Sequence, residues 1–141
     1  MRTFDQQQLI LEVADAIEEN AEFYSQSKWF NAFNECGTTC CIAGWAVRIA
    51  MPDEFFKRVD RAIALGPDKY EYEEVAEQDD EWFHEIGMAL FGLSDYESNL
   101  FNYDWMPPEG MTVPDALRKF AGGDELKDIT EPNCLMRKYT N

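Results

Sequence analysis

The stretch Cys36-Gly37-Thr38-Thr39-Cys40-Cys41-Ile42-Ala43-Gly44-Trp45-Ala46, residues 36–46, leads from a turn into a helix and places three of the four cysteines within six residues. Downstream of Cys40, apolar residues recur at three- and four-residue steps, the period of one helix face. They are Cys41, Ile42, Trp45, Ala46, Ile49 and Ala50. A helix is therefore predicted from Cys40 to Met51, with the hydroxyl of Thr38 or Thr39 as its N-cap.

The flanking sequence carries the same helical period on both sides. Further predicted helices cover residues 6–25, 53–65, 80–91, 95–101 and 112–120. No segment alternates polar and apolar residues as a half-buried strand does. The chain is therefore predicted to be all-α, a compact single domain of five to six short helices. We expect this domain to span residues 1–127, with residues 128–141 as a tail that Cys134-Leu135-Met136 hold against it.

Length and composition are those of a folded single-domain protein. With 141 residues, 45% of them hydrophobic and 14% aromatic, the chain has enough apolar side chains for a core and needs no disulfide to fold. Residues 1–6 turn polar at once, and no apolar run approaches the roughly 18 residues of a membrane span. We therefore expect a cytoplasmic protein that does not enter a membrane and whose thiols stay reduced.

The charge is strongly negative and unevenly distributed along the chain. The formal net charge is −16, and residues 71–141 hold 17 acidic against 5 basic side chains, a balance of −12. A field of this sign repels nucleic acid and anionic membranes, so direct nucleic-acid binding is not expected. The expected partner is a protein that is itself basic or that ordinarily holds DNA or RNA. The alternative is that the acidity serves solubility.

An acidic run in the middle of the chain is the predicted partner-binding surface. Its side chains are Glu71, Glu73, Glu74, Glu77, Asp79 and Asp80, with Tyr70, Tyr72 and Trp82 nearby as aromatic anchors. The run is predicted to be an exposed loop or a frayed helix. If the acidity serves solubility instead, the binding site is expected at exposed Tyr103, Trp105 and Met106.

The clustered thiols admit a catalytic interpretation. A thiol at a helix N-terminus has a lowered pKa, because the free backbone N–H groups stabilise the thiolate. Cys40 or Cys41 would then be a nucleophile, with His84, the only histidine, as its base.

A structural interpretation of the same cysteines is simpler. A zinc site would have to recruit Cys36, Cys40 or Cys41, His84 and Cys134 at irregular spacing, so neither a metal nor another cofactor is expected. Free cysteines are most often small buried side chains. We therefore expect no catalytic residue, and a structural motif made of Cys36, Thr38, Thr39, Cys41 and Trp45.

The cysteine segment, C-G-T-x-x-C followed by a hydrophobic residue and A-G-W-A, resembles a motif in small, mostly uncharacterised proteins of bacteriophages and bacteria. A downstream signature is similar as well, Leu90-Phe91-Gly92-Leu93-Ser94 and then Leu100-Phe101. The resemblance covers residues 8–50 and 83–121. It implies that Cys36 and Cys41 are the motif cysteines, that Cys40 is a variable position, and that the chain is a phage-encoded or prophage-encoded accessory protein, acting in the host cytoplasm if it is phage-encoded. It implies no activity.

The interpretation that the sequence favours is a small acidic protein-binding module. The resemblance extends it to a phage-encoded inhibitor or modulator of a host nucleic-acid-binding or defence protein. Two alternatives stay open at this point. One is a small cysteine-dependent enzyme using Cys40 or Cys41 with His84, and the other is a structural or metal-stapled accessory protein.

Overall fold

The computed structural model describes residues 2–26, 40–72 and 74–133, and for residues 68, 71, 72 and 74–76 it describes the backbone alone. These residues form α-helices and short 3-10 helices, with no strand among them, so the expected all-α class is confirmed. In chain order the elements are α1 (Phe4–Glu19), η1 (Ala21–Phe23), α2 (Ile42–Ala50), α3 (Pro52–Leu65), α4 (Pro67–Tyr72), α5 (Glu74–Phe91), η2 (Glu97–Phe101), α6 (Val113–Ala121) and η3 (Leu126–Ile129).

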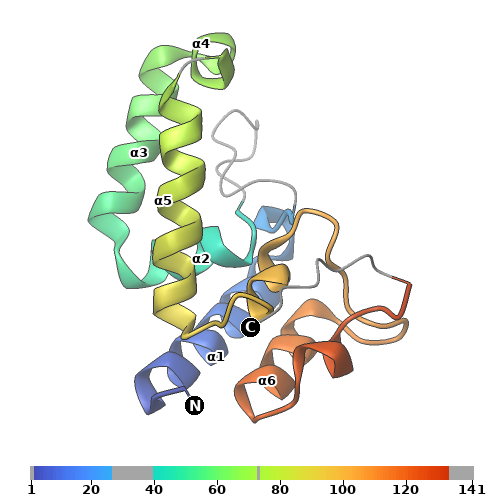
Figure 1. Ribbon diagram of the computed structural model, residues 1–141. Coiled ribbons are helices and arrows are strands. Elements are labelled where there is room, and N and C mark those ends of the chain that lie inside the picture. Colours follow the sequence, from blue (N-terminus) through green and yellow to red (C-terminus); the bar gives the residue numbers. More distant parts are fainter. Residues whose placement is uncertain (1, 27–39, 73, 134–141) are drawn as a thin grey trace.

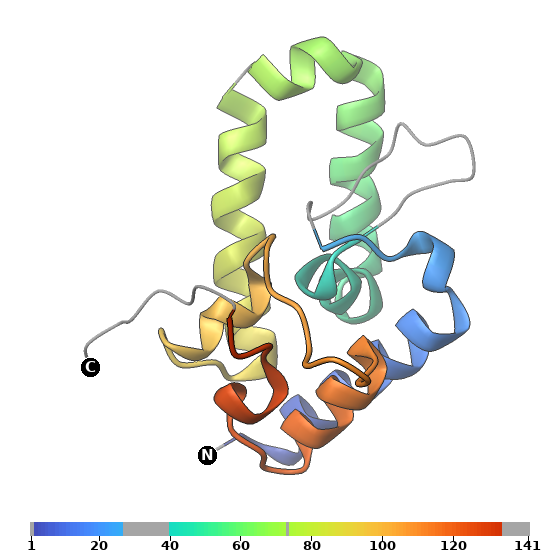
Figure 2. The same ribbon diagram turned by 90° about the vertical axis from the view of Figure 1, so that its right-hand side faces the viewer.

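The helices form a base and an arm (Figure 1). In the base, α1 and α6 pack against each other, with α2 above α1 and the 3-10 helices η2 and η3 alongside. The arm consists of α3, α4 and α5. Its two long helices rise from the base, and α4 crosses between their far ends (Figure 2). The core runs from the base into the lower arm, where Phe55 and Phe83 meet edge to face with ring centroids 6.2 Å apart.

Helix α1 begins at a capping box and ends earlier than its apolar period predicts. The Thr3 hydroxyl accepts from the Gln6 N–H at 3.2 Å, while the Gln6 side chain accepts from the Thr3 N–H at 2.8 Å. The predicted end near Ser25 is wrong, because α1 stops at Glu19. Asn20 donates from both its backbone N–H and its side-chain amide to the Ala16 carbonyl, and these bonds close the helix.

Helix α2 lies at the centre of the fold and is buried from Ile42 to Val47. Its N-cap is Cys41, whose sulfur accepts from the Gly44 N–H at 3.4 Å, so the expectation of a threonine cap is wrong. The small residues of α2 let α5 approach closely. A Cβ added at Gly87 of α5 would lie 3.2 Å from the Ala43 Cβ.

The acidic run predicted as a loop or frayed helix is divided between two helices. Glu71 belongs to α4, while Glu74, Glu77, Asp79 and Asp80 belong to α5, which starts six residues before the predicted start at Asp80. Glu73 lies outside the described residues. Helical geometry therefore sends those members of the run that belong to α5 to different faces of this helix.

The signature Leu90-Phe91-Gly92-Leu93-Ser94 ends one helix and starts the next. Gly92 has φ +66°, and the Leu93 N–H donates to the Met88 carbonyl at 2.9 Å, as in a Schellman motif. Ser94 then forms a capping box, since its hydroxyl accepts from the Glu97 N–H at 3.2 Å and the Glu97 carboxylate accepts from the Ser94 N–H at 3.0 Å. The predicted glycine stop is confirmed, whereas the predicted helix over residues 95–101 is a 3-10 helix that begins at Glu97 with Tyr96 as its N-cap, so the Ser94–Glu97 pair lies just ahead of it.

The chain after residue 127 begins as part of the core. Ile129 is fully buried, and the Thr130 hydroxyl accepts from the Trp105 indole N–H at 3.0 Å. The boundary expected between the domain and a tail at residue 128 therefore falls inside η3 and its packing. Cys134-Leu135-Met136, expected to hold the tail, lie outside the described residues.

Candidate functional site

Cys40 and Cys41 are buried thiols. Cys40 is 0% exposed and Cys41 is 1% exposed. Burial raises the pKa of each to about 12 from its ordinary value of 9.0, because a thiolate there would lose its hydration. The Arg48 guanidinium near Cys40 and the α2 N-terminus around Cys41 act in the opposite direction, and desolvation outweighs both. The expected lowering of the pKa at this helix start is therefore wrong.

Backbone hydrogen bonds tie Cys40 to the segment that follows η1. Cys40 forms a parallel bridge with Tyr24, in which its N–H donates to the Phe23 carbonyl at 2.9 Å and its carbonyl accepts from the Ser25 N–H at 2.9 Å. The Trp45 indole N–H donates to the same Phe23 carbonyl at 3.3 Å. This bridge joins the end of η1 to the start of α2.

The other members of the cysteine hypotheses are scattered or outside the described residues. His84 lies half-buried on α5. Cys36, Thr38, Thr39 and Cys134 lie outside the described residues. Within residues 2–26, 40–72 and 74–133, no group of three or more His, Cys, Asp or Glu side chains is arranged to hold a metal ion. Thiols with a pKa near 12 are poor nucleophiles at neutral pH.

The predicted exposure of Asp79 is wrong. Expected on an exposed partner surface, Asp79 is 0% exposed and lies inside the arm. Its carboxylate accepts from Arg58 at 2.6 Å, from Arg61 at 2.8 Å and from the Tyr70 hydroxyl at 2.7 Å. Burial and the neighbouring carboxylate raise the pKa of Tyr70 well above its ordinary value. Asp79 therefore links α3, α4 and α5, and its charge is balanced inside the fold.

The rest of the predicted acidic surface is only partly described. Glu77 and Asp80 are exposed on α5, whereas the side chains of Glu71, Glu73 and Glu74 lie outside the description. Two further carboxylates that the prediction did not include, Glu81 and Glu85, are also exposed and follow Glu77 at four-residue steps. We call Glu77, Glu81 and Glu85 the acidic edge of α5, since such a spacing places side chains along one side of a helix.

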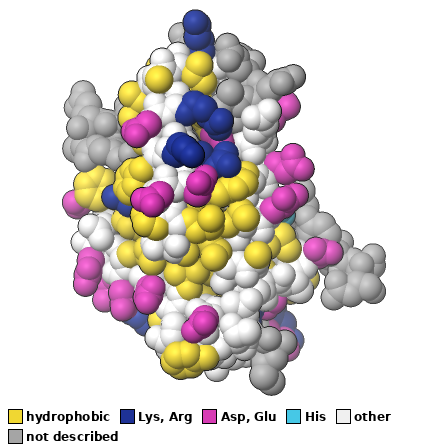
Figure 3. Space-filling view, turned by 90° about the vertical axis from the view of Figure 1, so that its left-hand side faces the viewer, with side chains coloured by type: hydrophobic (Ala, Val, Ile, Leu, Met, Phe, Trp, Pro, Cys, Tyr) yellow, Lys and Arg dark blue, Asp and Glu magenta, His cyan; other side chains and the backbone are white. Residues whose placement is uncertain are grey.

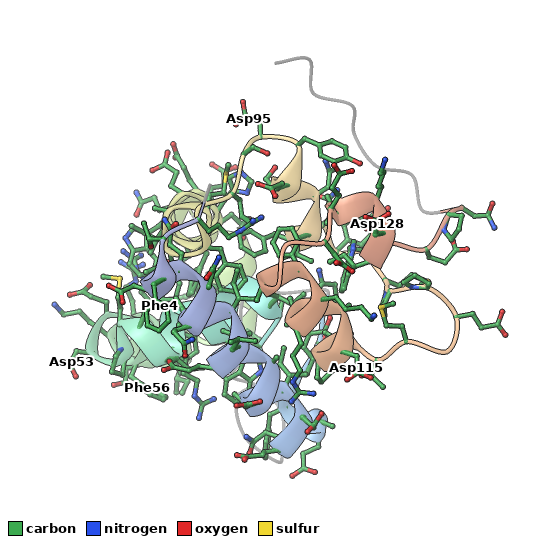
Figure 4. All side chains as sticks on the ribbon, turned by 90° about the horizontal axis from the view of Figure 1, so that it is seen from below. Phe4, Asp53, Phe56, Asp95, Asp115 and Asp128 are labelled. Atoms are coloured by element: carbon green, nitrogen blue, oxygen red, sulfur yellow. The ribbon has the colours of Figure 1, made fainter. Side chains whose placement is uncertain are left out.

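The described arginine side chains all contact other groups of the chain. Each arginine among the described residues has a partner within the chain: the pairs are Arg2–Glu97, Arg58–Asp79, Arg61–Asp79, Arg118–Asp15 and Arg118–Glu18, and Arg48 lies over the Trp45 ring. The surplus carboxylates then dominate the exterior. Figure 4 shows four of them, Asp53, Asp95, Asp115 and Asp128, projecting from widely separated parts of the ribbon. The negative charge is thus spread around the molecule rather than confined to the acidic run.

One face of the arm is partly apolar. Trp82, Ile86 and Leu90 follow one another at four-residue steps on α5 and are half-buried, and the Arg58 guanidinium lies 3.8 Å from the Trp82 ring centre. Figure 3 shows the molecule from the left-hand side of Figure 1, where α3 lies, and hydrophobic side chains gather in the middle of this view. Carboxylates lie at the flanks of this group, and Lys and Arg side chains lie above it.

The alternative aromatic site is also corrected by the structure. Tyr103 and Met106 are 76% and 53% exposed, as expected, but Trp105 is 3% exposed. The Trp105 indole is turned inward to Thr130, and the Met106 carbonyl accepts from the Glu131 N–H at 3.0 Å. Trp105 therefore anchors this loop and contributes no exposed surface.

The structure is therefore that of an all-α protein with a net negative charge, arginines that have partners within the chain, and two buried thiols. Comparison with known protein families, with curated proteins and with solved structures finds no match. Among the helices of the described residues, none combines the length and the apolar character needed to span a bilayer.

Proposed function

We propose that this protein is a non-enzymatic, acidic module that binds another protein. The observation that carries the proposal is the surplus of carboxylates: each described arginine has a partner within the chain, and the formal net charge is −16. Such a surface attracts cationic proteins over long distances and speeds their encounter. The pKa values near 12 of Cys40 and Cys41 weigh against the cysteine-enzyme alternative.

The chemistry of the partner follows from this field. We propose a basic protein, or one whose surface ordinarily holds DNA or RNA, because its cationic groups would bind carboxylates in place of phosphates. The resemblance that we infer from the sequence motif at residues 36–46, to small proteins of bacteriophages and bacteria, motivates a finer proposal. In it, the chain is phage-encoded, acts in the host cytoplasm, and inhibits or modulates a host nucleic-acid-binding or defence protein.

Affinity capture tests the proposal directly. The tagged full chain is incubated with nuclease-treated bacterial lysate, and the retained proteins are identified by mass spectrometry and then purified for binding measurements. We expect a saturable 1:1 or fixed-ratio complex whose affinity falls as salt rises, since exposed charges are screened over about 8 Å at physiological ionic strength. A folded, equally sized protein of similar net charge is the control.

Two results would contradict the proposal. The first is capture of the same proteins in the same amounts by the control, because the retention would then reflect net charge alone. The second is a turnover of a small-molecule substrate that disappears when Cys40 or Cys41 is replaced by alanine in a folded variant, which would establish the enzyme instead.

A further inference from the structure

The arm presents an apolar stripe and an acidic edge side by side on one helix. The stripe is Trp82, Ile86 and Leu90, and the edge is Glu77, Glu81 and Glu85. Both repeat every four residues on α5, so they run parallel along the helix for about two turns. Ala89 is exposed between them and adds a small apolar side chain to the stripe.

We propose that this face of α5 is the docking surface of the protein and that its occupant is a cationic amphipathic helix of the partner. This inference rests on the proposed protein-binding function. Apolar side chains of the incoming helix would cover Ile86 and Ala89, while Lys or Arg side chains one position to the side would meet Glu81 and Glu85. Helix recognition commonly combines an apolar seam with charges along its flank in this way.

Charge complementarity selects this occupant over the other candidates. A second copy of the chain would bring its own net charge of −16 and the same acidic edge to the contact, and the two copies would repel each other. A nucleic acid or an anionic membrane would be repelled by the same carboxylates. A cationic helix is attracted by the edge and gains apolar contact on the stripe.

The arginines at the upper end of the arm do not reverse this selection. Arg58 and Arg61 both contact the buried Asp79 carboxylate, at 2.6 and 2.8 Å. Arg58 also covers the Trp82 ring, which fixes the upper limit of the stripe. The cationic occupant is therefore expected along the lower α5 turns, where Glu81 and Glu85 flank Ile86 and Ala89.

A designed peptide tests the inference with a defined probe. The probe is a fluorescein-labelled 18-residue helix with leucine on one face and lysine on its flanks, and the control peptide has the same composition in scrambled order. Binding to the full chain is measured by fluorescence anisotropy at several salt concentrations. We expect the amphipathic peptide to bind more tightly than the scrambled one and to shift backbone NMR signals of α5.

Matched variants locate the site. Glu81→Lys with Glu85→Lys should weaken peptide binding about tenfold, because two attractive contacts become repulsive. Glu12→Lys with Glu19→Lys makes the same charge change at exposed positions of α1 and should have a smaller effect. Ala89→Gln should weaken binding several-fold, whereas Ala64→Gln, at an exposed position of α3, should leave it unchanged.

Several outcomes would overturn the inference. The docking surface would not lie on α5 if both double variants weakened peptide binding equally. The same conclusion would follow if the scrambled peptide bound as tightly as the amphipathic one, or if the amphipathic peptide did not bind at low salt. Dimerisation of the chain that is lost in Ala89→Gln would assign the face to a second copy. If the peptide fails while the partner captured from lysate still binds, the protein-binding function stands and its surface lies elsewhere.

Discussion

Replacing Asp79 by asparagine is expected to destabilise the protein strongly, although the residue belongs to an acidic run that looks exposed in the sequence. The substitution keeps the shape of the side chain and removes its charge. Asp79 is 0% exposed and accepts three hydrogen bonds, from Arg58, Arg61 and Tyr70. In Asp79→Asn the two guanidinium groups lose their counter-charge, and the asparagine amide group adds donors where acceptors are needed.

The magnitude follows from the exposure of the partners. Removing one member of a buried ion pair costs about 3–5 kcal/mol. The Arg58 and Arg61 side chains keep 19% and 43% of their exposure, so water compensates for part of the lost charge. We therefore expect the free energy of unfolding to fall by about 2–3 kcal/mol, which is a large fraction of the 5–15 kcal/mol typical of a domain.

Urea denaturation followed by circular dichroism measures this change. Glu81→Gln is the matched control, because it also neutralises a carboxylate on α5 but at an exposed position, and it should change stability by less than about 0.5 kcal/mol. A double-mutant cycle of Asp79→Asn with Arg61→Gln should show positive coupling. If Asp79→Asn unfolds at the same urea concentration as Glu81→Gln, the carboxylate does not hold the arm together and the reasoning is refuted.

The remaining predictions concern the thiols and the contact between α2 and α5. Cys40 and Cys41 should resist iodoacetamide at pH 7.5 in the folded protein and react in urea, as peptide mass spectrometry would reveal; rapid labelling without urea would contradict their burial. Burial raises the pKa values of both thiols from 9.0 to about 12, so these thiols lose their protons in the unfolded chain at lower pH than in the folded protein. The free energy of unfolding should therefore decrease as pH rises from about 9 towards 12, by up to ~1.4 kcal/mol per pH unit for each thiol. A flat stability profile between about pH 8 and 10.5 would argue against this linkage. Cys41→Ala should cost about 1–2 kcal/mol and Cys41→Ser less, because serine restores an N-cap acceptor for Gly44; thermal melting in the opposite order would show that packing outweighs capping. Gly87→Ala should lower the free energy of unfolding by about 1–3 kcal/mol despite the higher helix propensity of alanine, because the added Cβ would lie 3.0 Å from a Phe101 ring carbon. An unchanged melting temperature would show instead that the Phe101 ring moves aside freely.

The sequence by itself determined those features that depend on neighbours along the chain. The three- and four-residue apolar period identified an all-α protein and the main helices, because side chains at these steps share a helix face whatever surrounds it. Gly92 and Ser94 marked the end of α5 and the following turn, since a positive φ and a hydroxyl cap are local requirements. The small residues at the start of α2 indicated that another helix could approach closely, but only the tertiary structure shows that this helix is α5.

Tertiary structure alone decided the environment of the polar and sulfur-containing side chains. Asp79 looks like its exposed neighbours until α3 brings Arg58 and Arg61 against it from 21 and 18 residues away. Cys41 lies at a helix N-terminus, which favours a thiolate, but it is 1% exposed in the folded chain, and desolvation raises its pKa instead. Trp105 is turned inward by Thr130, 25 residues away. Charge balance and hydration are set by groups distant in sequence, so no local pattern encodes them.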